Sequence, residues 1–265
     1  MKKIIAAVLV LAALSGCGEK TDLNGPSILA GTTMIESLIR DVSKNIEVST
    51  LVPPAQCPGH FDLKPKDAEK IKNSNVVILH PFQEYLLEKI KKINPDIKVK
   101  KLKARALTTP SGYFSGIEAV AGILAGFYPG KAGNFGKNAK KSIEQIAREL
   151  KKDRKKVEMI AEKNYKVVCS GFQKDLCRFF GFEIIGVFGA PDSLSVKKAA
   201  GLAAKTKKAN LIVSNLTGTH DMTAKIINKE AKKKKVALAN FPLKSGEGGM
   251  FLSVWRYNLE QLEGI

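Results

Sequence analysis

The sequence predicts an α/β protein with two parallel-sheet lobes joined by one long rigid helix. Two observations support this prediction. Short apolar runs, typical of buried strands, alternate with amphipathic helical segments before residue 128 and again after residue 165, and such alternation favours parallel sheets. Between the two blocks, residues 132–164 show no strand signal, and their apolar residues recur at helical spacing.

The N-terminus precedes the fold and has the features of an export signal. Lys2 and Lys3 come before an apolar run over residues 4–14, which is too short to span a bilayer. The run ends in Leu-Ser-Gly before Cys17, which resembles the cleavage box of bacterial lipoproteins. We therefore expect a signal peptide over 1–16 and a lipid on Cys17. The mature protein would then lie outside the cytoplasm, anchored to the cell membrane.

The first lobe is predicted to span residues 27–131, after a tether over 17–26. Its first helix has Thr32 or Thr33 near the cap, and its second has proline in the first turn. A lysine-rich strand reads as an edge strand. The predicted strands are 27–31, 46–52, 75–79 and 97–102, and the predicted helices are 33–42, 65–73, 82–93 and 115–127.

The linking helix over 132–164 and the second lobe over 165–265 follow. A helix of this size would be about 40 Å or more in length, which suits an element that runs along both lobes. The predicted strands of the second lobe are 166–169, 183–188, 210–214 and 235–239. Its predicted helices are 172–180, 193–206, 220–233 and a last one from about residue 251.

The chain is strongly basic, with a formal net charge of +19. Lysine supplies most of this charge, in runs such as 151–156 and 232–235. Such runs can mark nucleic-acid binding, but here no aromatic residues are interleaved with them. We therefore favour solvated helix faces, with attraction to an anionic membrane, and expect no nucleic-acid partner.

All three histidines follow apolar, strand-like segments. His60 and His80 come after two predicted strands of the first lobe, and His220 lies a short loop beyond a strand of the second lobe. In open α/β sheets the carboxyl ends of the strands form the binding crevice, and imidazole is the most common metal-ligating side chain. The histidines therefore predict a metal site between the two lobes.

The stretch 51–67 is the most specific motif. It reads Leu-Val-Pro-Pro, then Pro-Gly-His-Phe-Asp, then Lys-Pro-Lys-Asp. With the strand at 75–79 and the Tyr-Pro-Gly at 128–130, it resembles the periplasmic metal-binding lipoproteins of zinc and manganese ABC importers. The resemblance implies the cluster A-type architecture of that family, a role as its solute-binding protein, and a ligand role for His60. The order of strands and helices agrees with that family over nearly the whole mature chain. Only the region around His60 also matches a sequence motif of the family.

The chain departs from that family at the other three ligand positions. Where the family has its second histidine, residues 111–114 read Ser-Gly-Tyr-Phe. Ser170 stands where the family has a third histidine or a carboxylate, and Asn240 stands in place of the final aspartate. Either the site has migrated, or it no longer binds a bare metal ion.

Migration is physically plausible, because a neighbouring parallel strand lies only about 5 Å away. His60 and His80 can then reach one ion, and His220 would come from the second lobe. Tetrahedral zinc needs one more ligand, for which Cys57, Cys169, Glu84 and water are candidates. A thiolate beside imidazoles would favour zinc over manganese.

We therefore expect a lipid-anchored solute-binding protein that passes a divalent metal, with zinc as the first candidate, to the permease of an ABC importer. One alternative is a binding protein for a metal chelate or other anionic ligand, and another is an interaction lipoprotein without a transport role. An enzyme with Cys169 as nucleophile is a further rival, but no base stands beside it in the sequence. The sequence leaves open whether Cys169 and Cys177 form a disulfide.

Overall fold

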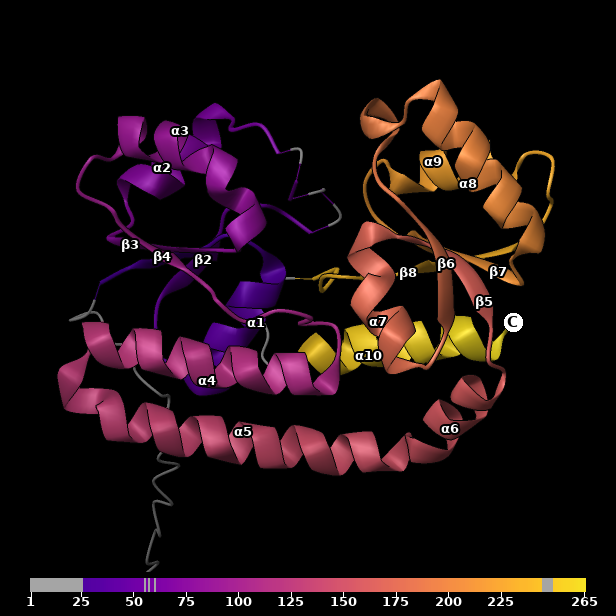
Figure 1. Ribbon diagram of the computed structural model, residues 1–265. Helices are drawn as coiled ribbons and strands as arrows, with labels where there is room; N and C mark the ends of the chain where they lie inside the picture. The colour runs from indigo at the N-terminus through magenta and orange to yellow at the C-terminus, as the bar shows by residue number, and fades with distance from the viewer. Residues whose placement is uncertain (1–25, 55, 57, 60, 245–249) are drawn as a thin grey trace, which may run out of the picture.

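Each of the two lobes is built on a four-stranded parallel sheet, and both lobes rest on a layer of long helices (Figure 1). The structure is a computed structural model, and it describes residues 26–54, 56, 58–59, 61–244 and 250–265. The predicted α/β architecture is confirmed. None of the helices in these ranges is long and apolar enough to cross a membrane.

The sheet of the first lobe has the strand order β2-β1-β3-β4. In its register, Ala30 of β1 pairs with Thr50 on one side and Ile78 on the other. The lysine-rich β4 lies at the edge, as its composition predicts. The strands are β1 (Ile28–Ala30), β2 (Val48–Thr50), β3 (Val76–Leu79) and β4 (Lys98–Lys101).

Helices cover both faces of this sheet because the strand residues alternate between them. Ile28 and Ala30 belong to the core under α1, whereas Leu29 belongs to the core under α2 and α3. Helix α1 has the predicted bounds and is capped by Thr32, whose hydroxyl accepts a hydrogen bond from the backbone of Ile35. The elements are α1 (Thr33–Val42), α2 (Pro65–Lys72), the 3₁₀ segment η1 (Pro81–Leu86) and α3 (Leu87–Ile93).

The sheet of the second lobe repeats this plan in the order β6-β5-β7-β8. Its strands are β5 (Lys166–Ser170), β6 (Glu183–Phe188), β7 (Leu211–Asn215) and β8 (Lys234–Leu238). The surrounding helices are η3 (Gly171–Gln173), α7 (Lys174–Phe179), η4 (Pro191–Ser193), α8 (Val196–Lys208) and α9 (His220–Asn228).

The helical layer beneath the lobes contains more than the single linking helix that the sequence predicts. The predicted 132–164 helix forms α5 and α6, which meet at Asp153. Helix α4 begins at Pro110 rather than at 115, because Thr109 caps it and proline suits its first turn. The elements are α4 (Pro110–Phe127), η2 (Pro129–Lys131), α5 (Ala132–Lys152), α6 (Arg154–Glu162) and α10 (Met250–Glu263).

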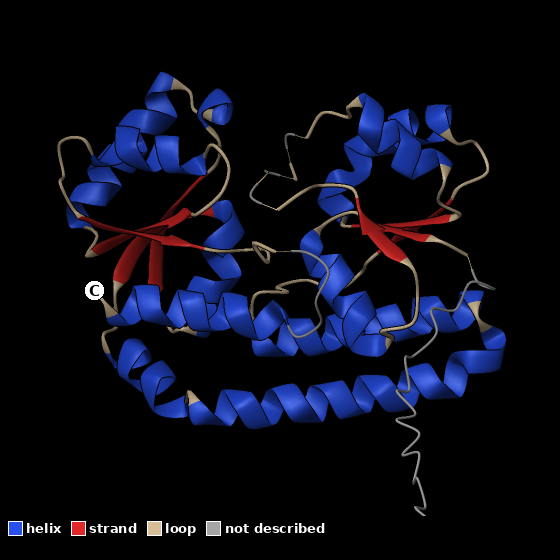
Figure 2. Cartoon of the chain, turned by 180° about the vertical axis from the view of Figure 1, so that it is seen from behind, coloured by secondary structure: helices blue, strands red, loops and turns tan. Residues whose placement is uncertain are grey.

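Helix α10 is a second connection between the lobes. It follows the last strand of the second lobe, but its first turn packs under the first lobe, where Phe251 stacks on Tyr113 of α4 with 4.2 Å between ring centroids. Farther along, the indole of Trp255 donates a hydrogen bond to Asp153. Seen from behind, the base helices run beneath both lobes (Figure 2). One hydrophobic cluster extends from Ile28 through this layer to Leu262.

Candidate functional site: the interlobe cleft

The carboxyl ends of both sheets face one cleft, as expected for the binding edge of open α/β sheets. A cavity of about 410 Å³ opens there. Four of its lining residues each follow a different strand: His80 follows β3, Arg105 follows β4, Phe172 follows β5 and Asn240 follows β8. Both lobes therefore contribute to its wall. Its volume falls in the range of small-molecule pockets.

His80 lies at this cleft, but its side chain is almost fully buried. Its Nε2 atom is 2.9 Å from the hydroxyl oxygen of Thr32. Phe82 stacks on the ring with 4.8 Å between centroids, and Phe241 of the second lobe meets it edge-on at 6.0 Å. Desolvation by burial lowers the pKa of His80 to about 3. The imidazole is therefore neutral at any physiological pH.

A buried glutamine fixes the loop that carries His80. The Gln83 side chain accepts a hydrogen bond from the His80 backbone and donates one to the carbonyl of Gly31. Gly31 allows this approach because a Cβ atom there would lie only 2.5 Å from Gln83 Oε1. The end of β1 and the start of η1 are thereby held together.

His220 begins α9 on the opposite side of the cleft and is also buried. Its Nδ1 atom is 2.7 Å from the hydroxyl oxygen of Ser170 at the end of β5. Phe172 stacks on its ring at 4.7 Å between centroids. The second imidazole, like the first, lies against a phenylalanine ring of the cleft wall.

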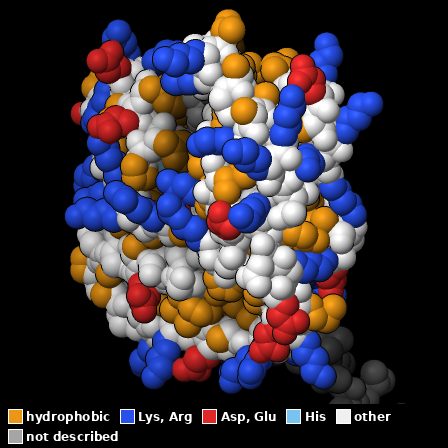
Figure 3. Space-filling view, turned by 45° about the vertical axis from the view of Figure 1, so that its right-hand side comes forward, with side chains coloured by type: hydrophobic (Ala, Val, Ile, Leu, Met, Phe, Trp, Pro, Cys, Tyr) orange, Lys and Arg blue, Asp and Glu red, His pale blue; other side chains and the backbone are white. Residues whose placement is uncertain are grey.

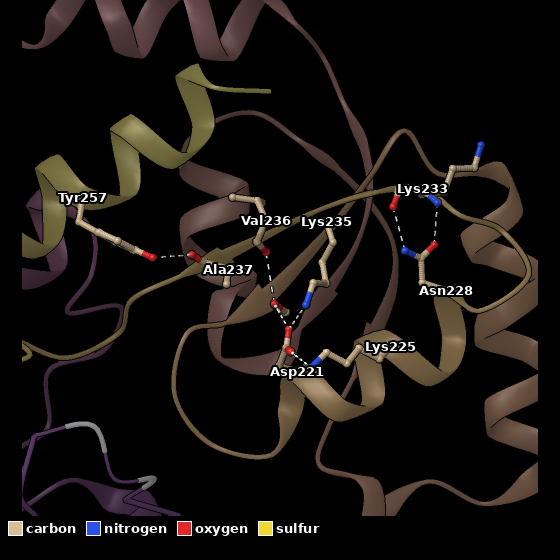
Figure 4. A network of polar contacts seen from close by, with 9 residues as sticks. Asp221, Lys225, Asn228, Lys233, Lys235, Val236, Ala237 and Tyr257 are labelled. Atoms are coloured by element: carbon tan, nitrogen blue, oxygen red, sulfur yellow. Dashed lines mark hydrogen bonds and ion pairs between the residues drawn. The ribbon is translucent and has the colours of Figure 1, made fainter.

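Asp221, next to His220, holds the start of α9 against the sheet (Figure 4). Its carboxylate forms ion pairs with Lys225 and Lys235 and accepts a hydrogen bond from Ser214. Partial burial acts to raise the pKa of Asp221, but the hydrogen bonds from these three side chains outweigh it and hold the pKa below its usual value. Asp221 is therefore a structural anchor for His220.

The structure brings His80 and His220 to one cleft but does not bring their rings into contact. Phe82 and Phe172 stand between them, with 6.2 Å between their ring centroids. The sequence analysis did not identify this pair of phenylalanines. A signal was available, because Phe82 lies three residues after the end of β3 and Phe172 two residues after the end of β5, at the edge where ligands bind.

His60 and Cys57 lie outside the described residues, so their part in the predicted site remains a prediction. The loop around them is anchored by Tyr85, whose hydroxyl accepts a hydrogen bond from the backbone of Phe61 and donates one to the carbonyl of Pro58. Within the described part of the chain, no group of three or more His, Cys, Asp or Glu side chains is placed to hold a metal ion.

The other predicted fourth ligands point elsewhere. Glu84 is exposed and forms an ion pair with Lys101. Cys169 and Cys177 are buried free thiols rather than a disulfide. The hydrogen bond between these thiols, together with burial, raises the pKa of Cys177 well above its usual value. Cys169, the nucleophile of the enzyme alternative, is itself fully buried, although the hydrogen bond with Cys177 lowers its pKa, and a nucleophilic thiol has to be accessible to its substrate.

Of the three positions at which the sequence differs from the resembled ligand pattern, residues 170 and 240 are buried and residue 111 is exposed. Residue 111 lies in the first turn of α4. Ser170 is fully buried against His220, and Asn240 is buried at the cleft. Over the face in Figure 3, lysine and arginine side chains are widespread and acidic ones are fewer, in agreement with the net charge of +19.

Comparison with known proteins agrees with this architecture. The model of a family described as zinc-uptake complex component A, periplasmic, matches residues 28–264. No curated protein sequence matches the chain.

Solved structures show the same fold at low sequence identity. The Cd-bound periplasmic metal-binding protein from Candidatus Liberibacter asiaticus has 19% identity and a TM-score of 0.73, covering 90% of this chain and 99% of that one. Its Mn-bound form has 18% identity and a TM-score of 0.70, with the same coverage. The periplasmic zinc-binding protein TroA from Treponema pallidum has 15% identity and a TM-score of 0.72, covering 91% and 98%.

Proposed function

Because this chain belongs to the family of the periplasmic component A of zinc-uptake complexes, we propose that it is a solute-binding protein that captures a divalent transition metal in the interlobe cleft. Zinc is the first candidate for this cargo. The main support is the cleft itself, which lies where the carboxyl ends of two parallel sheets face each other. The similar structures are named for bound cadmium, bound manganese and zinc binding.

We place this protein outside the cytoplasm, anchored through a lipid on Cys17, and working with the permease of an ABC importer. The signal-like residues 1–16 support export, although they lie outside the described residues. The hydroxyl of Tyr128 donates a hydrogen bond to the carbonyl of Pro26. The tether would therefore leave the body beside the end of α4, away from the cleft.

The ligands that we propose are His60, His80 and His220. Support for His220 comes from its position, since its ring contacts Ser170, the residue that stands where the family has a ligand. His220 would therefore supply the metal-binding imidazole that is missing at residue 170. For His80 and His220 to bind one ion, Phe82 and Phe172 would have to leave the space between them. The helical base limits closure of whole lobes, so such movement would be confined to loops and side chains.

Titration calorimetry of the metal-free full chain with zinc, manganese and cadmium tests this proposal. We expect zinc to bind, and each of His60→Ala, His80→Ala and His220→Ala to weaken binding at least tenfold. Arg256→Gln, on the far helix α10, serves as the control and should leave binding unchanged. Circular dichroism checks that each variant is folded. Absence of binding by all three ions, or binding that survives all three histidine substitutions, contradicts the proposal.

A further inference from the structure

The wall of the cleft is unusually aromatic for a site that holds a bare cation. Phe82 is 43% exposed, a large value for a phenylalanine that lines a cavity. Phe172 faces it from the second lobe, and Phe241 completes the aromatic surface. Each of the two facing rings also covers an imidazole. Three phenyl rings therefore line the cavity beside His80, whereas His220 is not among its lining residues, and phenyl surface favours flat organic groups.

Asn240 presents a hydrogen-bond donor to this cavity. The residue lines the cavity and is only 7% exposed. Its Oδ1 atom accepts a hydrogen bond from Gln173 at 2.6 Å. The same Gln173 amide nitrogen also faces the carbonyl of Leu238 at 2.8 Å, which fixes it as the donor. Within the described residues no group accepts a hydrogen bond from Asn240 Nδ2, so the donor end is left for a ligand.

Arg105 adds a positive charge to the same wall. No described carboxylate forms an ion pair with it. Its loop is fixed by α4, because Thr109 donates both a backbone and a hydroxyl hydrogen bond to the carbonyl of Ala106. The carboxylate of Asp175, which also lines the cavity, is 3.4 Å from the guanidinium of Arg178. A guanidinium and an amide N–H group bind carboxylate oxygens, whereas neither group can coordinate a metal ion.

From this combination we infer that the cleft binds a flat organic carboxylate, whose oxygens meet Arg105 and Asn240 and whose planar part packs against the cavity face of Phe82 or Phe172. The inference rests on the proposed binding function of the cleft and names the class of its ligand. Two sources share this chemistry, namely a free aromatic acid and the anionic complex of such an acid with a divalent metal. In the second case the metal enters the cleft already chelated.

Calorimetry of the full chain with dipicolinate (pyridine-2,6-dicarboxylate) tests the inference, using the free dianion, its zinc complex and zinc chloride as three separate titrants. We expect at least one form of dipicolinate to bind. Arg105→Gln and Asn240→Asp should each weaken that binding about tenfold or more, because each removes a donor to a carboxylate. Asn240→Asp keeps the oxygen that Gln173 needs, so the fold is preserved.

Two matched variants on α5 control for charge. Arg148→Gln removes one positive charge and Asn134→Asp adds one negative charge, both at exposed positions outside the cleft, and neither should change binding more than twofold. Comparison of the free dianion with its zinc complex decides between the two sources.

Two results would overturn the inference. In the first, zinc chloride binds, neither form of dipicolinate binds, and Asn240→Asp strengthens the binding of zinc. The cargo is then the bare ion, and only the proposed function stands. If none of the three titrants binds, both the inference and the proposed function fail.

Discussion

His80 shows how the fold can bury a side chain that the sequence predicts as a ligand. It follows a strand at the binding edge, which is where a ligand histidine is expected. The fold places it beneath Phe82 and against Thr32 instead. At the same edge, the amide oxygen of Asn240 already accepts a hydrogen bond from Gln173. At the scale of residues, the cleft selects ligands by which of its side-chain atoms donate hydrogen bonds and which accept them.

The neutral imidazole of His80 should make the folded state sensitive to acid. Its pKa is about 3 in the folded protein and near 6.5 when exposed. Between these values the unfolded chain binds the extra proton, so stability is lost as the pH falls through this window. From pH 6.5 to pH 4 this amounts to about 3 kcal/mol. Urea unfolding across this range, compared with His80→Asn, measures it.

The variant His80→Asn has no ring to protonate, so its free energy of unfolding should fall less steeply over the same pH range. His60 and His220 are unchanged in both proteins, and their contributions cancel in the comparison. Parallel pH profiles for the two proteins would show that His80 is not the group responsible.

At the scale of elements, helix α4 sets the position of the cleft loop that carries Arg105. The first turn of α4 lies so close to this loop that a Cβ atom on Gly112 would be 2.2 Å from the carbonyl oxygen of Ala106. Ala106 itself has a positive φ of 55°. The contact explains why helix α4 contains glycine in its first turn, where the sequence analysis expected a loop.

Gly112→Ala should therefore destabilise the protein by about 2 kcal/mol, because the loop must move to accept the methyl group. Gly122→Ala, on the same helix, is the matched control, since no atom lies within 4 Å of its Cβ position. That variant should gain up to about 1 kcal/mol from helix propensity alone. Chemical denaturation measures both values. Equal effects of the two substitutions would contradict the packing argument.

Most of the elements could be predicted from the sequence because their signals are local. The bounds of α1, its Thr32 cap and the edge position of β4 follow from periodicity, capping and composition. The interruption at Asp153 could not be predicted in this way, since its partner Trp255 is distant in the chain. The same holds for the cleft, where Phe82 and Phe172 meet only after both lobes have folded.

At the scale of the whole molecule, the two lobes share one core. The stacking of Phe251 on Tyr113 and the ion pair between Arg256 and Glu149 join the last helix to α4 and α5. Lobes connected only by a flexible linker would unfold independently. Here the hydrophobic cluster continues from one sheet through the base into the other, so loss of either lobe exposes apolar surface on its neighbour.

We therefore expect a single thermal unfolding transition in scanning calorimetry, with equal calorimetric and van't Hoff enthalpies. Phe251→Ala should lower the free energy of unfolding by about 3–5 kcal/mol, because it leaves a cavity in the shared core. Phe179→Ala is the control, since Phe179 is 40% exposed and should cost less. Two separate transitions in the unmodified protein would show that the lobes are independent.

The place of Phe251 also has a consequence for how the chain is made. Tyr113 is fully buried in the finished protein, and its ring lies against a residue close to the C-terminus. A nascent chain cannot complete the packing of its first half until the ribosome has added the final helix. Until then the polypeptide stays incompletely folded, a state compatible with passage through a translocation pore before the native structure forms.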